Sequence, residues 1–145
     1  MTKLVNYKKG GIYMDKKKLK ILVVFLNIIF FSITFYFIRK KAYETKLEDG
    51  MFSYAIQQGI PKEKIKKTNM KYYPKGQRYE YEVYINNLDD NKYFIFSYVL
   101  KESPFKTYLF QEKIDTTYID SSAYIDGSVV GVEDKMAKPL LDKIQ

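Results

Sequence analysis

Carboxylate and amide side chains are the first candidates for chemistry in this sequence. The segment NNLDDN, residues 86–91, could offer oxygen ligands to Ca²⁺, but the spacing, the glycine and the closing glutamate of an EF-hand are missing. Asn and Asp also favour turns, so a loop between two strands is the expected structure. Glu80 and Glu82 alternate along a predicted strand and could form a carboxylate pair for acid–base chemistry. The nearby Lys and Arg residues favour an exposed, charged sheet face instead.

Ser103 and Lys106 match the S-x-x-K spacing of serine–lysine acyl-transfer enzymes. That chemistry requires the serine at the N-terminus of a helix and the lysine one turn later. Pro104 and the flanking strand-like residues predict a loop here, and the partner motifs S-D-N and K-T-G are absent. The chain also lacks His and Cys, which removes the commonest general base, the commonest metal ligand and any disulfide. We therefore expect a protein that is not an enzyme.

A run of basic residues is the main charged feature of the second half of the chain. Seven of them fall within seventeen positions, with Glu63 as the single acidic residue among them. They are Lys62, Lys64, Lys66, Lys67, Lys71, Lys75 and Arg78. From Gln111 onward the balance reverses, with seven acidic residues against four lysines. Two interpretations stay open: an ordinary solvated face, or a patch that contacts an anionic wall polymer, a lipid surface or an acidic partner.

The stretch from Ile21 to Ile38 organises the rest of the chain. It holds eighteen residues without a charge. As a helix it would be about 27 Å long, close to the ~30 Å hydrocarbon core of a bilayer. A soluble core helix would show a polar stripe and a signal peptide would end at small residues, whereas the basic triplet Arg39–Lys41 follows here. The stretch is therefore predicted to be a permanent transmembrane helix in contact with the lipid bilayer.

Charge is distributed unevenly on the two sides of this helix. The net charge is +8, but residues 1–41 hold ten Lys or Arg against one acidic residue, whereas residues 42–145 hold fifteen against sixteen. The high pI therefore belongs to the anchor and does not indicate nucleic-acid binding. By the positive-inside rule, the lysines before the span place the N-terminus in the cytoplasm and the domain on the extracytoplasmic side. The predicted location is the cell membrane, crossed once.

The first twenty residues form a basic cytoplasmic tail with two candidate starts. Codons for the segment from Lys8 to Met14, KKGGIYM, can spell a purine-rich run like a bacterial ribosome-binding site. Translation would then begin at Met14. A basic tail that begins at Met1 is the alternative, and the sequence leaves both open.

Residues 42–58 have the periodicity of a helix. Apolar side chains share one helix face at the expected spacings: Tyr43, Leu47, Met51 and Tyr54. Gly50 weakens the centre of this segment and predicts a kink or a break. Gly59 supplies the stop signal at its C-terminus.

After the helix the period changes to two, which predicts antiparallel strands at residues 67–73, 78–85, 92–100 and 105–114. In the second strand, one face holds Tyr79, Tyr81, Val83 and Ile85, and the other holds Arg78, Glu80, Glu82 and Tyr84. The third strand is almost wholly apolar, so we expect it in the centre of the sheet, covered on both faces. Residues 115–145 are predicted as a loosely ordered tail, with a short strand near Tyr118 or Tyr124 and a short helix near Met136.

These elements predict an α+β fold, in which a helix covers one face of a four-stranded antiparallel meander. The expected organisation is a basic tail (1–20), a transmembrane helix (21–38), an extracytoplasmic α+β domain (42–114) and a C-terminal tail (115–145). The fifteen tyrosines suit a half-exposed sheet, in which the ring packs and the hydroxyl stays in water. They are either ordinary strand formers or a ligand-binding aromatic face.

A basic start and a single span precede the segments QQGIPKEKIKK, YEYEVYI and YVLKESPFKTYLF. Together these features resemble a family of short single-pass membrane proteins of low-GC Gram-positive bacteria, known as a domain of unknown function. The resemblance covers most of residues 14–130 and implies a cell-membrane location with no assigned activity or catalytic residue. The anchor and the general layout are also similar to the small PepSY-type modules that regulate peptidases.

Two functions follow as expectations. The first is a membrane-anchored extracytoplasmic module that binds or supports an envelope protein or an anionic wall polymer. The second is a regulator or inhibitor of an envelope peptidase or a cell-wall enzyme. No cofactor, metal or nucleic acid is expected as a partner, because the sequence holds no motif for one.

Overall fold

The computed structural model describes residues 15–89, 92–125 and 128–131. Its longer elements are α1 (Lys16–Gln57), β1 (Ile65–Tyr73), β2 (Arg78–Ile85), β3 (Lys92–Val99), α2 (Pro104–Phe110), β4 (Ile119–Ile125) and β5 (Ser128–Gly131). Short 3-10 helices lie between them: η1 (Lys62–Lys64), η2 (Pro74–Gly76) and η3 (Thr116–Tyr118). Both candidate starts and the helix predicted near Met136 lie outside the described residues. The chain divides into two compact units, and the second unit begins at Tyr36.

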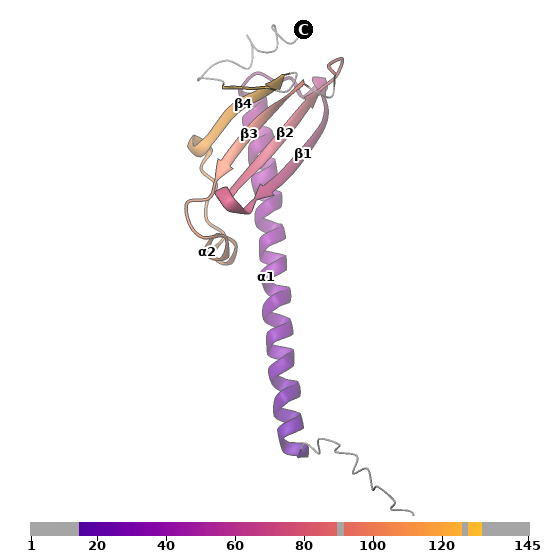
Figure 1. Cartoon of the computed structure of the whole chain (residues 1–145), viewed down its shortest axis with the longest axis vertical. Helices are drawn as coiled ribbons and strands as arrows, with labels where there is room; N and C mark the ends of the chain where they lie inside the picture. The colour runs from indigo at the N-terminus through magenta and orange to yellow at the C-terminus, as the bar shows by residue number, and fades with distance from the viewer. Residues whose placement is uncertain (1–14, 90–91, 126–127, 132–145) are drawn as a thin grey trace, which may run out of the picture. The chain divides into compact units, whose positions relative to one another are not determined.

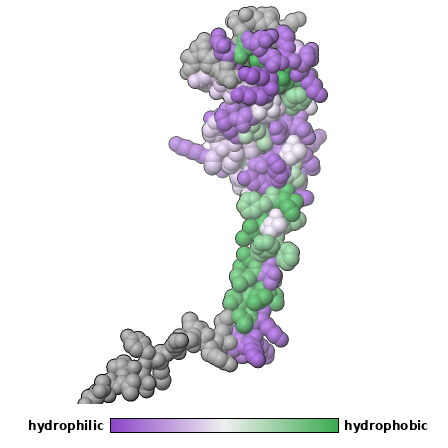
Figure 2. Space-filling view, turned by 90° about the vertical axis from the view of Figure 1, so that its right-hand side faces the viewer, coloured by the Kyte–Doolittle hydropathy of each residue, from purple (hydrophilic) through white to green (hydrophobic). Residues whose placement is uncertain are grey.

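The first unit consists, where it is described, of the N-terminal part of α1. Its side chains are exposed from Lys16 to Phe35, and the surface of this part of the helix is mostly apolar (Figure 2). The side chain of Asn27 donates to the carbonyl of Val23 at 2.7 Å, and the hydroxyls of Ser32 and Thr34 likewise reach carbonyls one turn earlier. Lipid offers no hydrogen bonds, so this internal pairing suits a bilayer. The helix is long and apolar enough to cross a membrane, in agreement with the prediction.

The second unit packs the C-terminal part of α1 against one face of an antiparallel sheet (Figure 1). Within the described residues the sheet has five strands in the order β1-β2-β3-β4-β5, so every strand pairs with its neighbour in sequence. The predicted α+β class, with a helix on an antiparallel meander, is confirmed. The strand 92–100 also lies at the centre of the sheet, as predicted. The expected cover on both faces is wrong for the described residues, because Tyr93 and Ser97 are half-exposed and Val99 is 45% exposed.

A single stripe of α1 fills the core between helix and sheet. It repeats every four residues and is fully buried: Tyr43, Leu47, Met51 and Ala55. The inner face of the sheet meets this stripe with large side chains, including Tyr81 of β2 and Phe96 of β3, both 1% exposed. The ring of Tyr54 stands edge-on to Phe96, with 5.8 Å between the centroids. Burial of these side chains removes apolar surface from water and is the main stabilising contribution to the unit.

The buried tyrosine hydroxyls of the core find polar partners. The hydroxyls of Tyr79 and Tyr108 lie 2.7 Å apart, and the Tyr79 hydroxyl donates to Glu44 Oε1 at 3.0 Å. Burial raises the pKa of Tyr108 to about 12, and burial also raises the pKa of Tyr79. Both phenols therefore stay protonated at neutral pH and can be hydrogen-bonded without a buried charge.

Helix α1 passes through Gly50 without the predicted break. Leu47 and Met51, on either side of this glycine, are completely buried. Their burial is worth more than the ~1 kcal/mol that glycine costs in a helix, so tertiary packing overrides the local preference. The helix does end where the sequence predicts: Gly59 takes a φ of 94°, and its backbone N–H donates to Ile56 at 3.0 Å. Such a left-handed glycine is a common helix terminator.

The prediction of a strand at residues 105–114 is wrong, because α2 occupies this segment. The Ser103 side chain caps the helix by accepting from the Lys106 N–H at 3.5 Å. Pro104 stands at the start of the helix, where its missing N–H is not needed. The next strand is β4, which pairs with β3, so the short strand predicted near Tyr118 or Tyr124 is present. It belongs to the sheet, however, and not to a loosely ordered tail.

We predict that Phe96→Ala lowers the free energy of unfolding by about 3–5 kcal/mol, because it removes a fully buried ring from the centre of the core. The control is Tyr118→Ala, since Tyr118 is 50% exposed. That control should change stability by less than about 0.5 kcal/mol. Urea unfolding of the full chain in mild-detergent micelles, followed by near-UV circular dichroism, would measure both. Equal losses would contradict the buried face described above.

Candidate binding face

The sheet face directed away from α1 carries ordered rows of polar and aromatic side chains, and we call it the outer face. The strand register places these side chains in four cross-strand rows. The rows are Lys67, Tyr84, Tyr93 and Tyr124; Asn69, Glu82, Ile95 and Ser122; Lys71, Glu80, Ser97 and Asp120; and Tyr73, Arg78 and Val99. Neighbouring rows lie about 7 Å apart, because they are two residues apart along a strand.

Three tyrosines in the first row stack on one another and form what we call the tyrosine ladder: Tyr84, Tyr93 and Tyr124. The ring centroids of Tyr84 and Tyr93 are 4.7 Å apart, and those of Tyr93 and Tyr124 are 4.9 Å apart. Lys67 Nζ lies 4.3 Å from the centroid of Tyr84, within range of a cation–π interaction. Stacking across strands holds each ring in place, so the ladder is a preorganised, half-exposed aromatic surface.

Glu82 lies next to the ladder and is the best-satisfied polar group of the outer face. Its carboxylate accepts from Lys71 Nζ at 2.6 Å, from Asn69 Nδ2 at 3.0 Å and from the Tyr84 hydroxyl at 3.0 Å. The residue is only 4% exposed, whereas the Lys71 side chain is 47% exposed. A buried carboxylate is tolerated when it is paired and hydrogen-bonded in this way. Glu82 thus ties β1 to β2 and holds the first tyrosine of the ladder.

These contacts move the pKa values of the group away from neutrality. Burial would raise the pKa of Glu82, but its hydrogen bonds with Lys71, Asn69 and Tyr84 hold it below the ordinary value. The hydrogen bond to Glu82 raises the pKa of Lys71. Burial, together with the Glu82 carboxylate, raises the pKa of Tyr84 to about 12. General acid–base catalysis near pH 7 needs pKa values close to 7, whereas these contacts move the three pKa values away from it.

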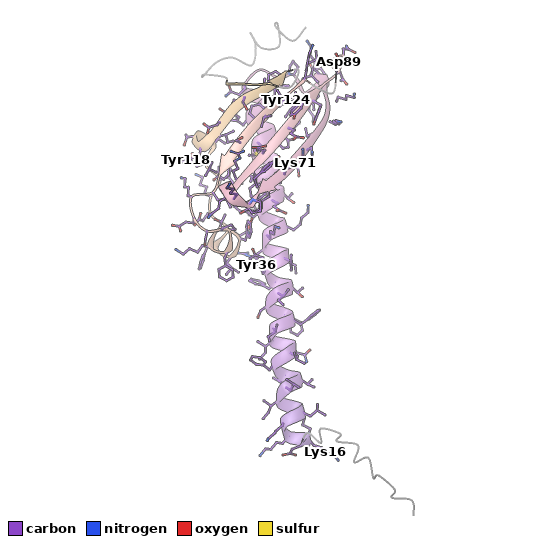
Figure 3. All side chains as sticks on the ribbon, viewed as in Figure 1. Lys16, Tyr36, Lys71, Asp89, Tyr118 and Tyr124 are labelled. Carbon is purple, nitrogen blue, oxygen red and sulfur yellow. The ribbon has the colours of Figure 1, made fainter. Side chains whose placement is uncertain are left out.

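A shallow hollow of ≈ 510 Å³ opens on the outer face beside the ladder. Tyr93 and Tyr124 of the ladder line one side of it, and Tyr73 and Arg78 of the fourth row line another. Its remaining lining residues come from the two middle rows: Lys71, Glu80, Glu82, Ile95, Ser97 and Ser122. The small serine side chains leave room between the larger groups. Figure 3 labels Lys71 on β1 and Tyr124 on β4, and β2 and β3 lie between these two strands.

The predicted basic run does not converge on one patch. Lys62 and Lys64 lie on η1, before β1, whereas Lys75 lies on η2, after it. Nine residues of strand separate the two ends, a distance of about 30 Å. Lys66, Lys67 and Lys71 lie along β1, and Arg78 opens β2.

Part of this basic run has a structural role. Lys71 pairs with Glu82, and Arg78 Nη2 lies 2.7 Å from Glu80. β1 is also an edge strand, with a shift of register between Ile65 and Lys67. Lysines and bulges on an edge strand discourage pairing with other chains. Contact of the run with an anionic partner stays a prediction.

The structure also places the acidic and amide residues that the sequence suggested as candidates for chemistry. Glu80 and Glu82 share the outer face, as predicted, but Glu82 is buried and each carboxylate has its own cationic partner. In the loop after β2, Asn87 takes a left-handed φ of 66° that fits a turn, while Asp90 and Asn91 lie outside the described residues. Among the residues that the structure describes, no group of three or more acidic side chains could hold a metal ion.

Ser103 and Lys106 stand closer to the S-x-x-K arrangement than the sequence suggested. The serine does cap a helix and the lysine lies in its first turn, so the predicted loop is incorrect. The Lys106 ammonium, however, lies 3.4 Å from Glu102. Both side chains of this ion pair are about half-exposed, at 59% and 49%. This geometry gives Lys106 an ion-pair partner in Glu102 and does not indicate activation of the Ser103 hydroxyl.

Sequence reasoning missed the ladder and the burial of Glu82. Tyr124 belongs to the segment predicted as a tail, in which the sequence predicts a short strand near Tyr118 or Tyr124 but assigns no pairing partner to it. The alternation of β2 does put Glu82 and Tyr84 on one face, which was the available signal. No protein-family model, curated protein or solved structure matches this chain.

We predict that Glu82→Gln destabilises the fold by about 1–3 kcal/mol, because it weakens the charge-assisted hydrogen bonds to Lys71 and Tyr84. The loss should also depend on pH. The folded-state pKa of Glu82 lies below its ordinary value of 4.5, so its stabilisation is present above that value and disappears as the pH falls. Wild type should therefore lose more stability than the variant between about pH 6 and about pH 3.

Glu102→Gln is the control for this prediction, because its ion pair with Lys106 is exposed. Exposed pairs contribute about 0–1 kcal/mol, so this variant should stay close to wild type. Urea unfolding at a series of pH values would compare the three proteins. If Glu82→Gln and wild type showed parallel pH profiles, the carboxylate would not have the role assigned to it here.

Proposed function

We propose that this protein is a membrane-anchored binding module whose outer face holds an extended segment of an envelope protein. The tyrosine ladder beside the hollow is the observation that carries this proposal. The rings are held in place by stacking, so little side-chain entropy is lost when a ligand settles against them. The module is placed outside the cytoplasm because the lysines before the span are expected to stay inside.

The charge pattern of the outer face supports a polar partner without strong net charge. Three cations, Lys67, Lys71 and Arg78, stand against three carboxylates. The carboxylates are Glu80, Glu82 and Asp120. An anionic polymer laid across the hollow would meet these carboxylates, and such repulsion disfavours it. A peptide segment instead offers amides for the Ser97 and Ser122 hydroxyls and side chains for the ladder.

The exposure of the face supports the same conclusion. Apart from Glu82 and Ile95, its described side chains are half-exposed or exposed. Tyrosine is enriched in protein interfaces because it buries a large ring and keeps a hydrogen-bonding hydroxyl. A hollow lined by tyrosines, serines and fixed ion pairs is consistent with recognition of a protein surface.

We expect a photo-crosslinking amino acid at Ser97 or Ser122 to capture a partner in the native membrane, because both positions line the hollow. Adding Tyr93→Ala should reduce the yield at least fivefold, since it removes the middle ring of the ladder, worth about 1–3 kcal/mol in a buried interface. The matched control places the crosslinker at Ser53, an exposed position on α1. Equal yields at Ser53 and Ser97 would remove the support for the outer face.

Topology provides a separate prediction. A reporter that is active only outside the cytoplasm, fused after Gln145, should be active. Neutralising the lysines before the span should give mixed topology, because the triplet Arg39–Lys41 would then carry the charge bias. These lysines are Lys16, Lys17, Lys18 and Lys20. A reporter active only in the cytoplasm would reverse the proposed orientation.

A further inference from the structure

Helix α2 exposes two large aromatic side chains. In the described residues that follow α1, no large apolar side chain is more exposed than Phe105, at 61%, and Phe110, at 74%. The helix is only seven residues long, so these two rings dominate its outward surface. Its inward side is different, because Thr107 and Tyr108 are each 1% exposed. Aromatic surface of this kind is unfavourable in water and marks a contact site.

The same helix is fastened to the end of the apolar stretch. The rings of Phe105 and Tyr36 stack with 5.9 Å between centroids. Arg39 Nη2 donates to the carbonyl of Leu109 at 2.8 Å, and Gln111 Nε2 donates to the carbonyl of Arg39 at 2.8 Å. These contacts come from both ends of α2, so the helix cannot move away from Tyr36 and Arg39 without losing them. Figure 3 shows Tyr36 beside α2.

This attachment sets the depth of α2 relative to a bilayer. Tyr36 lies within the apolar stretch that ends at Ile38, and Arg39 is the first charge after it. Phe37 and Ile38 are 59% and 62% exposed, so the stretch still presents an apolar surface at this level. A bilayer that contains the stretch therefore has its boundary where α2 is attached.

We propose that α2 is an interfacial anchor, whose Phe105 and Phe110 rings insert among the lipids that surround the end of the span. The inference rests on the membrane anchorage within the proposed function. Lipid is the occupant that fits, because the Phe105 ring stacks on Tyr36, which belongs to the apolar stretch that is long enough to cross a membrane. Aromatic side chains at the head-group level are typical of membrane proteins. Lys106, whose ammonium pairs with Glu102 at 3.4 Å, is exposed on the same helix and can reach the head-group level.

A second lipid contact would restrict how the domain tilts on the membrane. A single transmembrane helix on its own can tilt in the bilayer. With α2 in the interface, the sheet has two points of attachment to the same leaflet. The outer face would then be presented in a defined direction, which lowers the entropic cost of capturing a membrane-bound partner.

The experiment uses the full chain in vesicles of phosphatidylcholine and phosphatidylglycerol. The chain contains no cysteine, so Lys106→Cys provides a single site for an environment-sensitive fluorophore. We expect quenching by lipids that carry a nitroxide near the head group, and weak quenching by aqueous iodide. In a Phe105→Ser, Phe110→Ser background, lipid quenching should fall at least threefold and iodide quenching should rise. Tyr118→Ser, which removes an exposed ring elsewhere, should leave the label unchanged.

Two further labels complete the design. Val24→Cys reports whether the span itself lies in the bilayer, and Asp89→Cys reports a position in the loop between β2 and β3 (Figure 3). If iodide quenches the Lys106 label as strongly as the Asp89 label, while the Val24 label still reports lipid, the inference is overturned and the anchorage of the span is not. Shielding from both quenchers also overturns it, since a protein would then cover α2. Loss of lipid quenching at Val24 overturns the anchorage and this inference together.

Discussion

The burial of one stripe of α1 against the inner face of the sheet is the constraint on which the second unit depends. Leu47, Met51 and Ala55 are completely buried, and they meet the tyrosines and phenylalanines of β2 and β3. This packing keeps α1 helical through Gly50, and it sets which face of each strand turns inward. Because side chains alternate along a strand, the choice of inner face also decides the composition of the outer face.

The outer face shows how the protein accommodates polar groups on a sheet that one helix covers. Its charges are paired: Lys71 with Glu82 across β1 and β2, and Arg78 with Glu80 along β2. Three of its tyrosines, Tyr84, Tyr93 and Tyr124, stack on one another across strands. The Lys71–Glu82 pair and the stacked tyrosines are cross-strand interactions, which stabilise the sheet and at the same time hold the side chains in a fixed arrangement. Stability and a preorganised binding surface therefore come from the same contacts.

The α2 segment illustrates a conflict between local patterns. Its alternation of Phe105, Lys106 and Thr107 resembles a strand, and the aromatic residues raise strand propensity. Ser103 and Pro104, however, form a helix N-cap followed by proline, which favours a helix start. The end of the apolar stretch decides the outcome, because it offers α2 the Tyr36 ring and the Arg39 side chain as partners. The strand that pairs with β3 is then β4. Its polar serines gave little indication of a strand in the sequence.

The sequence by itself determined the apolar helix, the α+β class and the bounds of β1, β2 and β3 within a few residues. These depend on periodicity and on turn residues, which are local properties of the chain. Only the tertiary structure decided that Glu82 is buried, that Tyr93 and Tyr124 stack, and that the basic run is divided along β1. Those features depend on strand register and on contacts between residues far apart in the chain. Register is set by packing in three dimensions, and the local pattern of a single sequence does not show that packing.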